Sequence, residues 1–256
     1  MELFYGKLLL DNIVTFSSKP LISLIVCHTH ICDKGKWRQN EMEISELLLY
    51  FVYVFTTIFI IVSPIEATLV FVALTTTMKS EEKSRIYKRT TFVAFAIAIL
   101  FFLTGDVVLR IFGITVDSLR VAGGILLFLM AMDMLQGVRP QNKVTRAEFL
   151  DANLREDISI FPLAIPLLTG PGTITAVVVL MSEANSLTEK SIVLLAICLT
   201  FLATFLILKS SKHIDQVLGI TGIMVLIRIM GLFLGALAVS FVATGAWNLY
   251  RAMAGA

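Results

Sequence analysis

Three prolines and two glycines interrupt an otherwise apolar stretch at residues 161–175, which reads FPLAIPLLTGPGTIT. Proline removes a backbone donor and clashes with the preceding helical turn, and glycine weakens a helix further. The stretch is nevertheless too hydrophobic for a surface loop, because apolar residues follow it directly at 177–181. Within a bilayer, broken backbone is tolerated only where it packs in protein or lines a polar cavity. Such a break is typical of the binding sites of secondary transporters.

The composition places the chain in a lipid bilayer. Of its 256 residues, 57% are hydrophobic and 16% are charged, whereas about a quarter of the residues of a soluble domain are charged. Its apolar runs approach the roughly 20 residues that a spanning helix needs. The net charge of +2 gives no reason to expect nucleic-acid binding, and the sequence holds no glycine-rich phosphate loop of a nucleotide-driven pump.

The first 41 residues differ from the rest of the chain. They are mixed in polarity, contain no spanning run, and hold the segment CHTHIC at 27–32. That spacing is too tight for a zinc finger and has no second ligand cluster downstream, so we predict no metal and no cofactor. From Met42 the sequence reads like a natural start, MEISELLLY. We therefore predict that 1–41 is a disordered or mis-assigned extension of a transmembrane domain at 42–256, which the mass of the native amino terminus would test.

Six membrane helices are predicted after this extension. They cover residues 44–78, 91–112, 119–138, 158–181, 191–208 and 217–243. The first helix is broken at Ser63-Pro64 and the fourth at Gly170-Pro171-Gly172. The predicted fold is therefore an all-α integral membrane protein in which two of the six helices are interrupted.

The basic residues predict how the chain crosses the membrane. Most of those after residue 41 fall in three predicted loops, at 79–89, 139–155 and 209–212. The alternate loops at 113–118 and 182–190 contain almost no lysine or arginine. Loops rich in lysine and arginine face the cytoplasm. We therefore expect a multi-pass protein of the plasma membrane with both termini outside.

The two halves of this domain resemble each other. The prolines of the two breaks are 107 residues apart, Arg120 and Arg228 are 108 apart, and GIT at 113–115 recurs at 219–221. Three spans in each half is an odd number, so the second half must enter the membrane upside down. Such inverted repeats are typical of secondary transporters whose binding site lies between the repeats. We predict repeat one at 42–140 and repeat two at 156–250, each with a broken first helix.

Both breaks read as helix starts. Ser63 suits the N-cap, Pro64 the first turn, and Glu66 the return partner of a capping box. The second break has the same pattern in Gly170, Pro171, Gly172 and Thr173. Unpaired N–H groups and the positive ends of two helix dipoles would attract a carboxylate. We therefore predict that these residues bind a small solute.

Three charged residues and a glycine pair add to this candidate site. Glu66 is the one acid placed well inside a span, where it either couples transport to a cation or only caps its helix or forms an ion pair. Arg120 and Arg228 could pair with it, neutralise substrate or cap loop carbonyls, and we favour a structural role. Gly123 and Gly124 suit close helix packing, with substrate contact as a second role.

Three motifs resemble those of the MarC family. They are FGITVDSLRVAGGI at 112–125, PLAIPLLTGPGTI at 162–174 and RIMG at 228–231, and the resemblance extends from Met42 to the carboxyl terminus. The resemblance implies a six-span plasma-membrane protein, and some members carry glycine or alanine with a cation gradient. Family members often have Asn or Asp where this chain has Ser63, and Gln where it has Ser240. The substrate and the coupling ion of other family members are therefore not assigned to this chain.

The leading hypothesis is a secondary transporter of small neutral amino acids such as glycine or alanine, coupled to Na⁺ or H⁺. The alternatives are an exporter of another small solute and a membrane scaffold that transports nothing, although a scaffold gains nothing from broken helices. An enzyme is not expected, because no predicted span pairs two aspartates or a serine with a histidine as an intramembrane protease would require. The direction of transport and homo-oligomer formation stay open.

Overall fold

A computed structural model describes residues 44–75, 78–137 and 168–255, without the side chains of 44, 212–218 and 220. The chain forms two compact units, Met1–Tyr50 and Phe51–Ala256. Of the first unit, only 44–50 are described, and they are helical. The predicted extension at 1–41, the basic loop at 139–155 and the start of the fourth span lie outside the described residues.

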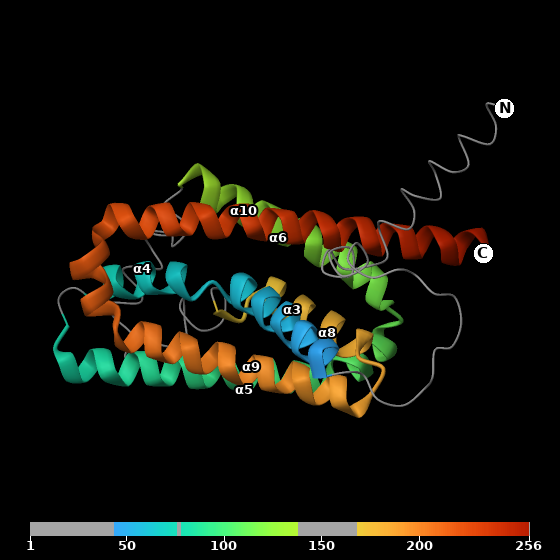
Figure 1. Cartoon of the computed structure of the whole chain (residues 1–256), viewed down its shortest axis with the longest axis horizontal. Coiled ribbons are helices and arrows are strands. Elements are labelled where there is room, and N and C mark those ends of the chain that lie inside the picture. Colours follow the sequence, from blue (N-terminus) through green and yellow to red (C-terminus); the bar gives the residue numbers. More distant parts are fainter. Residues whose placement is uncertain (1–43, 76–77, 138–167, 256) are drawn as a thin grey trace. The chain divides into compact units, whose positions relative to one another are not determined.

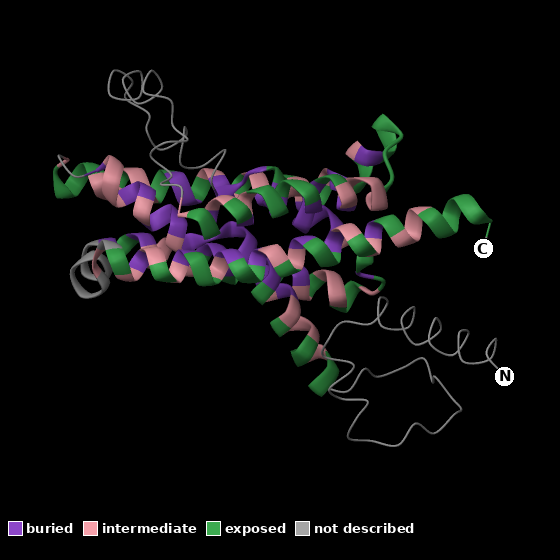
Figure 2. Cartoon of the chain, turned by 90° about the horizontal axis from the view of Figure 1, so that it is seen from above, coloured by how far each residue is buried: buried purple, intermediate pink, exposed green. Residues whose placement is uncertain are grey.

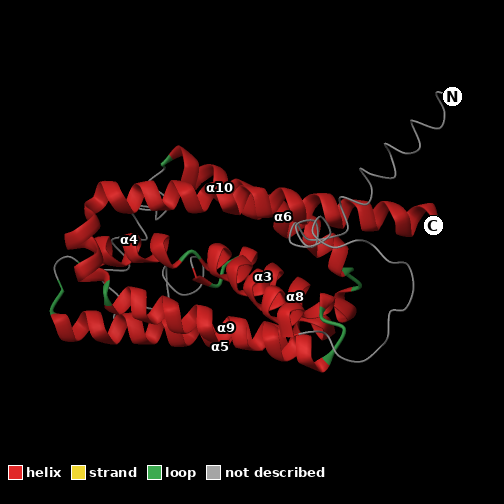
Figure 3. Ribbon diagram, viewed as in Figure 1, coloured by secondary structure: helices red, strands yellow, loops and turns green. Residues whose placement is uncertain are grey.

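The described chain is helical, and it contains no strand (Figure 3). Its helices are α3 (Ile44–Val62), α4 (Pro64–Leu74), α5 (Ser80–Phe112), α6 (Val116–Gln136), α8 (Pro171–Glu183), α9 (Leu187–Lys209) and α10 (Ser211–Ala254). Five segments, the first of them α3 and α4 together, are long and apolar enough to cross a bilayer, and α8 is a shorter apolar helix. The predicted all-α membrane fold is confirmed.

One predicted loop is wrong. Residues 79–89, expected as a basic loop, form the first turns of α5 instead. The Glu82 carboxylate accepts a hydrogen bond from the Lys79 backbone N–H at 3.1 Å, and the two acids of the first turn suit the positive end of the helix dipole. Good helix-forming residues and this capping contact extend the helix beyond the apolar span.

Equivalent helices of the two predicted repeats pack against each other. Helix α5 lies beside α9 and α6 beside α10, and each pair runs antiparallel, as inverted repeats require (Figure 1). The equivalent glycines Gly113 and Gly219 both have positive φ, of 66° and 62°. Only glycine adopts that conformation at little cost. At Gly219 this bends α10, which is longer than the predicted span.

Buried residues of the second unit gather where its helices cross, and outward faces are exposed along their length (Figure 2). One apolar cluster of buried residues draws on α3, α6, α8 and α10 and includes Ile61, Leu127, Ala176, Ile223 and Leu234. Large apolar side chains such as Leu103 and Ile111 are exposed. An apolar exterior around a packed interior is what a bilayer environment favours.

Glycines bring α6 and α10 close together, as the sequence predicts. A Cβ atom on Gly124 would lie 3.0 Å from the Ala238 carbonyl oxygen, and one on Gly231 would lie 2.8 Å from the Met134 Cβ. Both distances are too short for a side chain. Small residues of this kind let membrane helices approach backbone to backbone.

Candidate functional site

Ser63 is the single residue between α3 and α4. Its backbone is left-handed, with φ 47° and ψ 64°. Ser63 occupies the N-cap position of α4, as predicted, but its hydroxyl makes no capping hydrogen bond, because a capping side chain needs extended backbone. Ser63 is 5% exposed, and among the described residues its Oγ has no hydrogen-bond partner. Left-handed backbone costs an L-residue about 1–2 kcal/mol, and strain of this kind clusters at ligand sites.

The first turn of α4 is buried. Pro64 occupies the first helical position, as predicted, and its carbonyl accepts a hydrogen bond from Thr68 Oγ1 at 2.9 Å. Glu66 lies in the same turn and is 6% exposed. An acid buried inside a span is costly, and such residues are functional by default.

The second break has different local geometry. Gly170 is extended, with φ −64° and ψ 175°, and Pro171 begins α8. Thr173 corresponds to Glu66 in the repeat, and its hydroxyl donates a hydrogen bond to the Leu168 carbonyl at 2.9 Å. This bond joins the first turn of α8 to the residues before the break.

The two breaks are neighbours in the fold. A Cβ on Gly172 would lie 2.5 Å from Leu127 Cδ2 of α6 and 3.7 Å from Ile61 Cγ2, two residues before Ser63. Thr175 lies one turn after Gly172 in α8. A Cβ on Gly123 of α6 would lie 2.6 Å from the Thr175 Cβ. Gly172 of the second break therefore lies near the residues just before the first break and Gly123 packs on α8, whereas Gly124 packs on α10.

Arg120 is buried at one end of α8. Its guanidinium pairs with the Glu183 carboxylate and lies 3.6 Å from Asp117 Oδ1. Asn248 Nδ2 donates a hydrogen bond to the same oxygen at 2.9 Å. We call these four residues the Arg120 cluster, and they join α6, α8 and α10. This geometry supports the structural role favoured for Arg120.

Arg228, the repeat equivalent of Arg120, has a different setting. Its side chain is exposed, and its Nη2 lies 3.0 Å from where a Cβ on Gly137 would be. Gly137 caps the carboxyl end of α6 with φ 67°. A guanidinium there is favoured by the negative end of the helix dipole, which matches the predicted alternative of capping carbonyls.

Sequence reasoning missed the acidic and amide partners of Arg120. Asp117 precedes it by three residues, which places both on one helical face. Glu183 and Asn248 come from distant parts of the chain, and no local signal in the sequence indicates them. The segment at 27–32 lies outside the described residues, so its predicted lack of a metal site stays a prediction.

The chain is similar in sequence to known membrane proteins. The sequence profile described as MarC family integral membrane protein matches residues 48–250. The chain is 41% identical over 198 residues to the UPF0056 membrane protein MJ1677 of Methanocaldococcus jannaschii, covering 77% of this chain and 96% of the relative. It is 37% identical over 207 residues to a UPF0056 membrane protein of Aquifex aeolicus (81% and 97% covered). It is 35% identical over 204 residues to YhcE of Escherichia coli (79% and 94% covered). No solved structure matches it.

Proposed function

The chain belongs to the MarC family of integral membrane proteins, and from this premise we propose that it is a secondary transporter of small neutral amino acids. One observation carries the proposal. Two helix starts, each with proline at the first helical position, follow the two breaks, and Gly172 of the second lies close to Ile61, just before the first, where α8 packs on α6. Discontinuous helices at a repeat interface are the usual place for substrate in secondary transporters.

The chemistry of the breaks favours an amino-acid carboxylate. The first turns of α4 and α8 have backbone N–H groups without intrahelical partners, and both present the positive end of a helix dipole. The unpartnered hydroxyl of Ser63 adds a donor beside them. The glycines of the second break carry no side chain, which lets a small substrate such as glycine or alanine approach the backbone closely. Glu66 supplies negative charge for the substrate ammonium or for a coupling Na⁺ or H⁺.

Transport by alternating access would require α8 to move against α6. The close approach of Gly172 to Leu127 and of Gly123 to Thr175 fits a closed state, in which no side chain separates the helices. The Arg120 cluster links the far end of α8 to α6 and α10. If the site opened toward the carboxyl end of α8, the contacts of the Arg120 cluster would therefore have to rearrange.

Two alternatives would use the same fold. An exporter of another small solute would use the same breaks, and only transport measurements separate the two directions. A scaffold without transport explains neither the left-handed backbone of Ser63 nor its buried, unpartnered hydroxyl. We propose a transporter rather than an enzyme, because the described breaks present helix starts and one acid instead of a nucleophile with a base.

We also propose that the protein resides in the plasma membrane with its basic helix ends in the cytoplasm and both termini outside. The basic residues at the start of α5 and the end of α9 support this orientation. An impermeant thiol reagent added to intact cells should label a cysteine placed at Tyr250, which is exposed near the carboxyl terminus. Labelling only after the cells are opened would reverse the orientation.

Substitutions at Ser63 distinguish the contribution of its hydroxyl to ligand affinity from the contribution of its backbone strain to stability. Added as free amino acids, glycine and alanine should each raise the unfolding temperature of the wild-type protein, because a bound ligand stabilises the folded state. Both Ser63→Ala and Ser63→Gly should lower affinity by about 10- to 100-fold, the loss of about 1.5–3 kcal/mol from a hydrogen bond to a charged group. Without ligand, Ser63→Gly should be more stable than Ser63→Ala by about 1 kcal/mol, since glycine relieves the positive φ.

Calorimetric titration of purified protein with glycine, and with methylamine as a ligand that lacks the carboxylate, measures these effects. Methylamine should bind neither the wild type nor the variants. Unchanged glycine affinity in both variants would show that the first break does not hold the carboxylate.

A further inference from the structure

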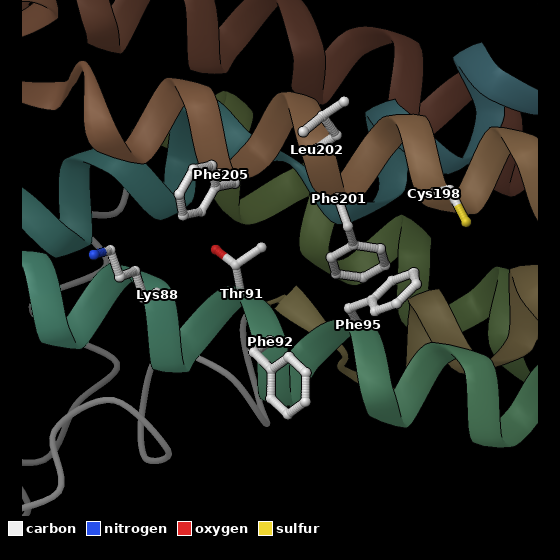
Figure 4. Close-up of a pocket in the computed structure, with 8 residues that line it drawn as sticks. All are labelled: Lys88, Thr91, Phe92, Phe95, Cys198, Phe201, Leu202 and Phe205. Atoms are coloured by element: carbon white, nitrogen blue, oxygen red, sulfur yellow. The ribbon is translucent and has the colours of Figure 1, made fainter.

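An open groove of about 270 Å³ lies between α5 and α9, on a part of the fold that the proposed transport does not use. We call it the α5–α9 groove, and its lining includes Lys88, Thr91, Phe95, Phe201, Leu202 and Phe205. These residues recur at helical spacings of three and four, so each helix presents one continuous face to the groove. Figure 4 shows the aromatic side chains of both helices facing one another across it.

Most of the groove is lined by apolar side chains, which suit a hydrocarbon chain. The rings of Phe95 and Phe201 contact each other with centroids 5.8 Å apart, and the ring of Phe205 packs on that of Tyr87 with centroids 5.4 Å apart. Leu202 is half exposed at the rim. Because both helices are membrane spans, this opening faces the bilayer. An acyl chain of a neighbouring lipid therefore matches the groove in polarity and access.

A polar group lies at one end of this apolar surface. Thr91 is 6% exposed, and its Oγ1 has no hydrogen-bond partner among the described residues. A helical threonine ordinarily bonds the carbonyl four residues back. Four others here do so, namely Thr68, Thr75, Thr104 and Thr204. A buried hydroxyl left unpaired costs about 1–3 kcal/mol, so the orientation of Thr91 into the groove (Figure 4) indicates a missing acceptor.

Positive charge lies beside this hydroxyl. Lys88 is one turn before Thr91 and lines the same end of the groove. The segment 79–89 carries five basic residues and two acidic ones, and Lys209 ends the neighbouring helix. Basic pockets between membrane helices at the cytoplasmic side bind anionic lipid headgroups. Thr91 also stands where the charged start of α5 gives way to its apolar part, which is the depth of a lipid phosphate.

We propose that the α5–α9 groove binds one anionic phospholipid. Its phosphate accepts hydrogen bonds from Thr91 Oγ1 and the Lys88 ammonium, and one acyl chain lies along the apolar surface that the phenylalanines of α5 and α9 form. The net negative charge of the headgroup distinguishes this ligand from a zwitterionic lipid. A second copy of the chain would cover the apolar part but leave the hydroxyl and the ammonium to be paired.

Cys198 reports directly on occupancy, because it lines the groove and its side chain is exposed. In the full chain with Cys27→Ser and Cys32→Ser, it is the remaining thiol. We would measure its labelling rate with a small maleimide in neutral detergent, with added dioleoyl phosphatidylglycerol or dioleoyl phosphatidylcholine. Phosphatidylglycerol should slow labelling at least threefold relative to phosphatidylcholine.

Three variants locate the effect. Thr91→Val removes the hydroxyl without changing the shape, and Lys88→Gln removes the charge from a side chain that is exposed, so both should fold. Each should remove most of the protection by phosphatidylglycerol. The matched control Lys83→Gln removes a charge from the same basic segment outside the groove lining and should keep it.

Equal labelling rates in the two lipids would overturn the proposal. Protection that Thr91→Val and Lys88→Gln leave unchanged would also overturn it. Protection that rises with protein concentration in the absence of phosphatidylglycerol would assign the groove to a second copy instead. Native mass spectrometry of the wild type should show one retained phosphatidylglycerol, and none in the double variant.

Discussion

Gly123→Ala is expected to lower the free energy of unfolding by about 2–3 kcal/mol, at the upper end of the usual effect of overpacking a core. The added Cβ would lie 2.5 Å from Thr175 Oγ1 and 2.6 Å from the Thr175 Cβ. Rotation of the threonine side chain moves its Oγ1 but not its Cβ, so the clash can be relieved only by separating α6 from α8. Helix propensity alone predicts the opposite sign, since alanine is favoured over glycine by about 1 kcal/mol.

Gly235→Ala is the matched control. A Cβ there would have one neighbour, the Ala131 Cβ at an ordinary 3.6 Å, so we expect no loss of stability or a gain of up to about 1 kcal/mol. Thr175→Gly should restore part of the stability of Gly123→Ala, because it removes the atoms that clash. Thermal unfolding in detergent measures all four proteins. Equal effects at Gly123 and Gly235 would show that α6 and α8 do not approach as closely as described.

Arg120→Gln is expected to have the second large effect. Removing one partner of a fully buried ion pair costs about 3–5 kcal/mol. Arg120 is buried, but its partners Glu183 and Asp117 have side chains that are 41% and 32% exposed. Solvent screens part of the loss, so we expect roughly 2 kcal/mol.

Arg228→Gln provides the comparison, because the repeat places it at the equivalent position in an exposed setting. Its effect should stay within about 0.5 kcal/mol, as for most surface substitutions. Glu183→Gln should destabilise less than Arg120→Gln, since Arg120 keeps Asp117 as a partner, whereas Arg120→Gln leaves both Glu183 and Asp117 without their cation. Chemical denaturation of the three variants tests this order. An Arg228 variant as unstable as the Arg120 variant would contradict the assignment of different roles to the two arginines.

The breaks could be predicted from the sequence because proline and glycine act locally. Pro64 and Pro171 begin helices where the sequence indicates, and the repeat pattern correctly paired the positive-φ positions Gly113 and Gly219. The same local reasoning failed at 79–89, where clustered charge suggested a loop although its residues favour a helix. Charge patterns indicate which side of the membrane a segment faces, but not where its helix begins.

The features that depend on tertiary packing could not be predicted. Ser63 adopts left-handed backbone only because the residues around it impose that conformation, and serine gives no such signal by itself. The partners of Arg120 are contributed by helices distant in sequence. The missing hydrogen bond of Thr91 is likewise visible only once α9 lies beside α5. In each case the sequence gives the identity of the residue but not which residues of other helices surround it.

The central claim is that the paired breaks bind and move a small amino acid. Uptake of radiolabelled glycine and alanine into proteoliposomes, under Na⁺ and H⁺ gradients applied separately, tests it most directly. Gly172→Val serves as the blocked control, because its side chain would meet Leu127 at the second break. We predict uptake driven by one of the two gradients and lost in the variant. No uptake under either gradient, with the protein shown to be folded and inserted, would contradict the proposed function.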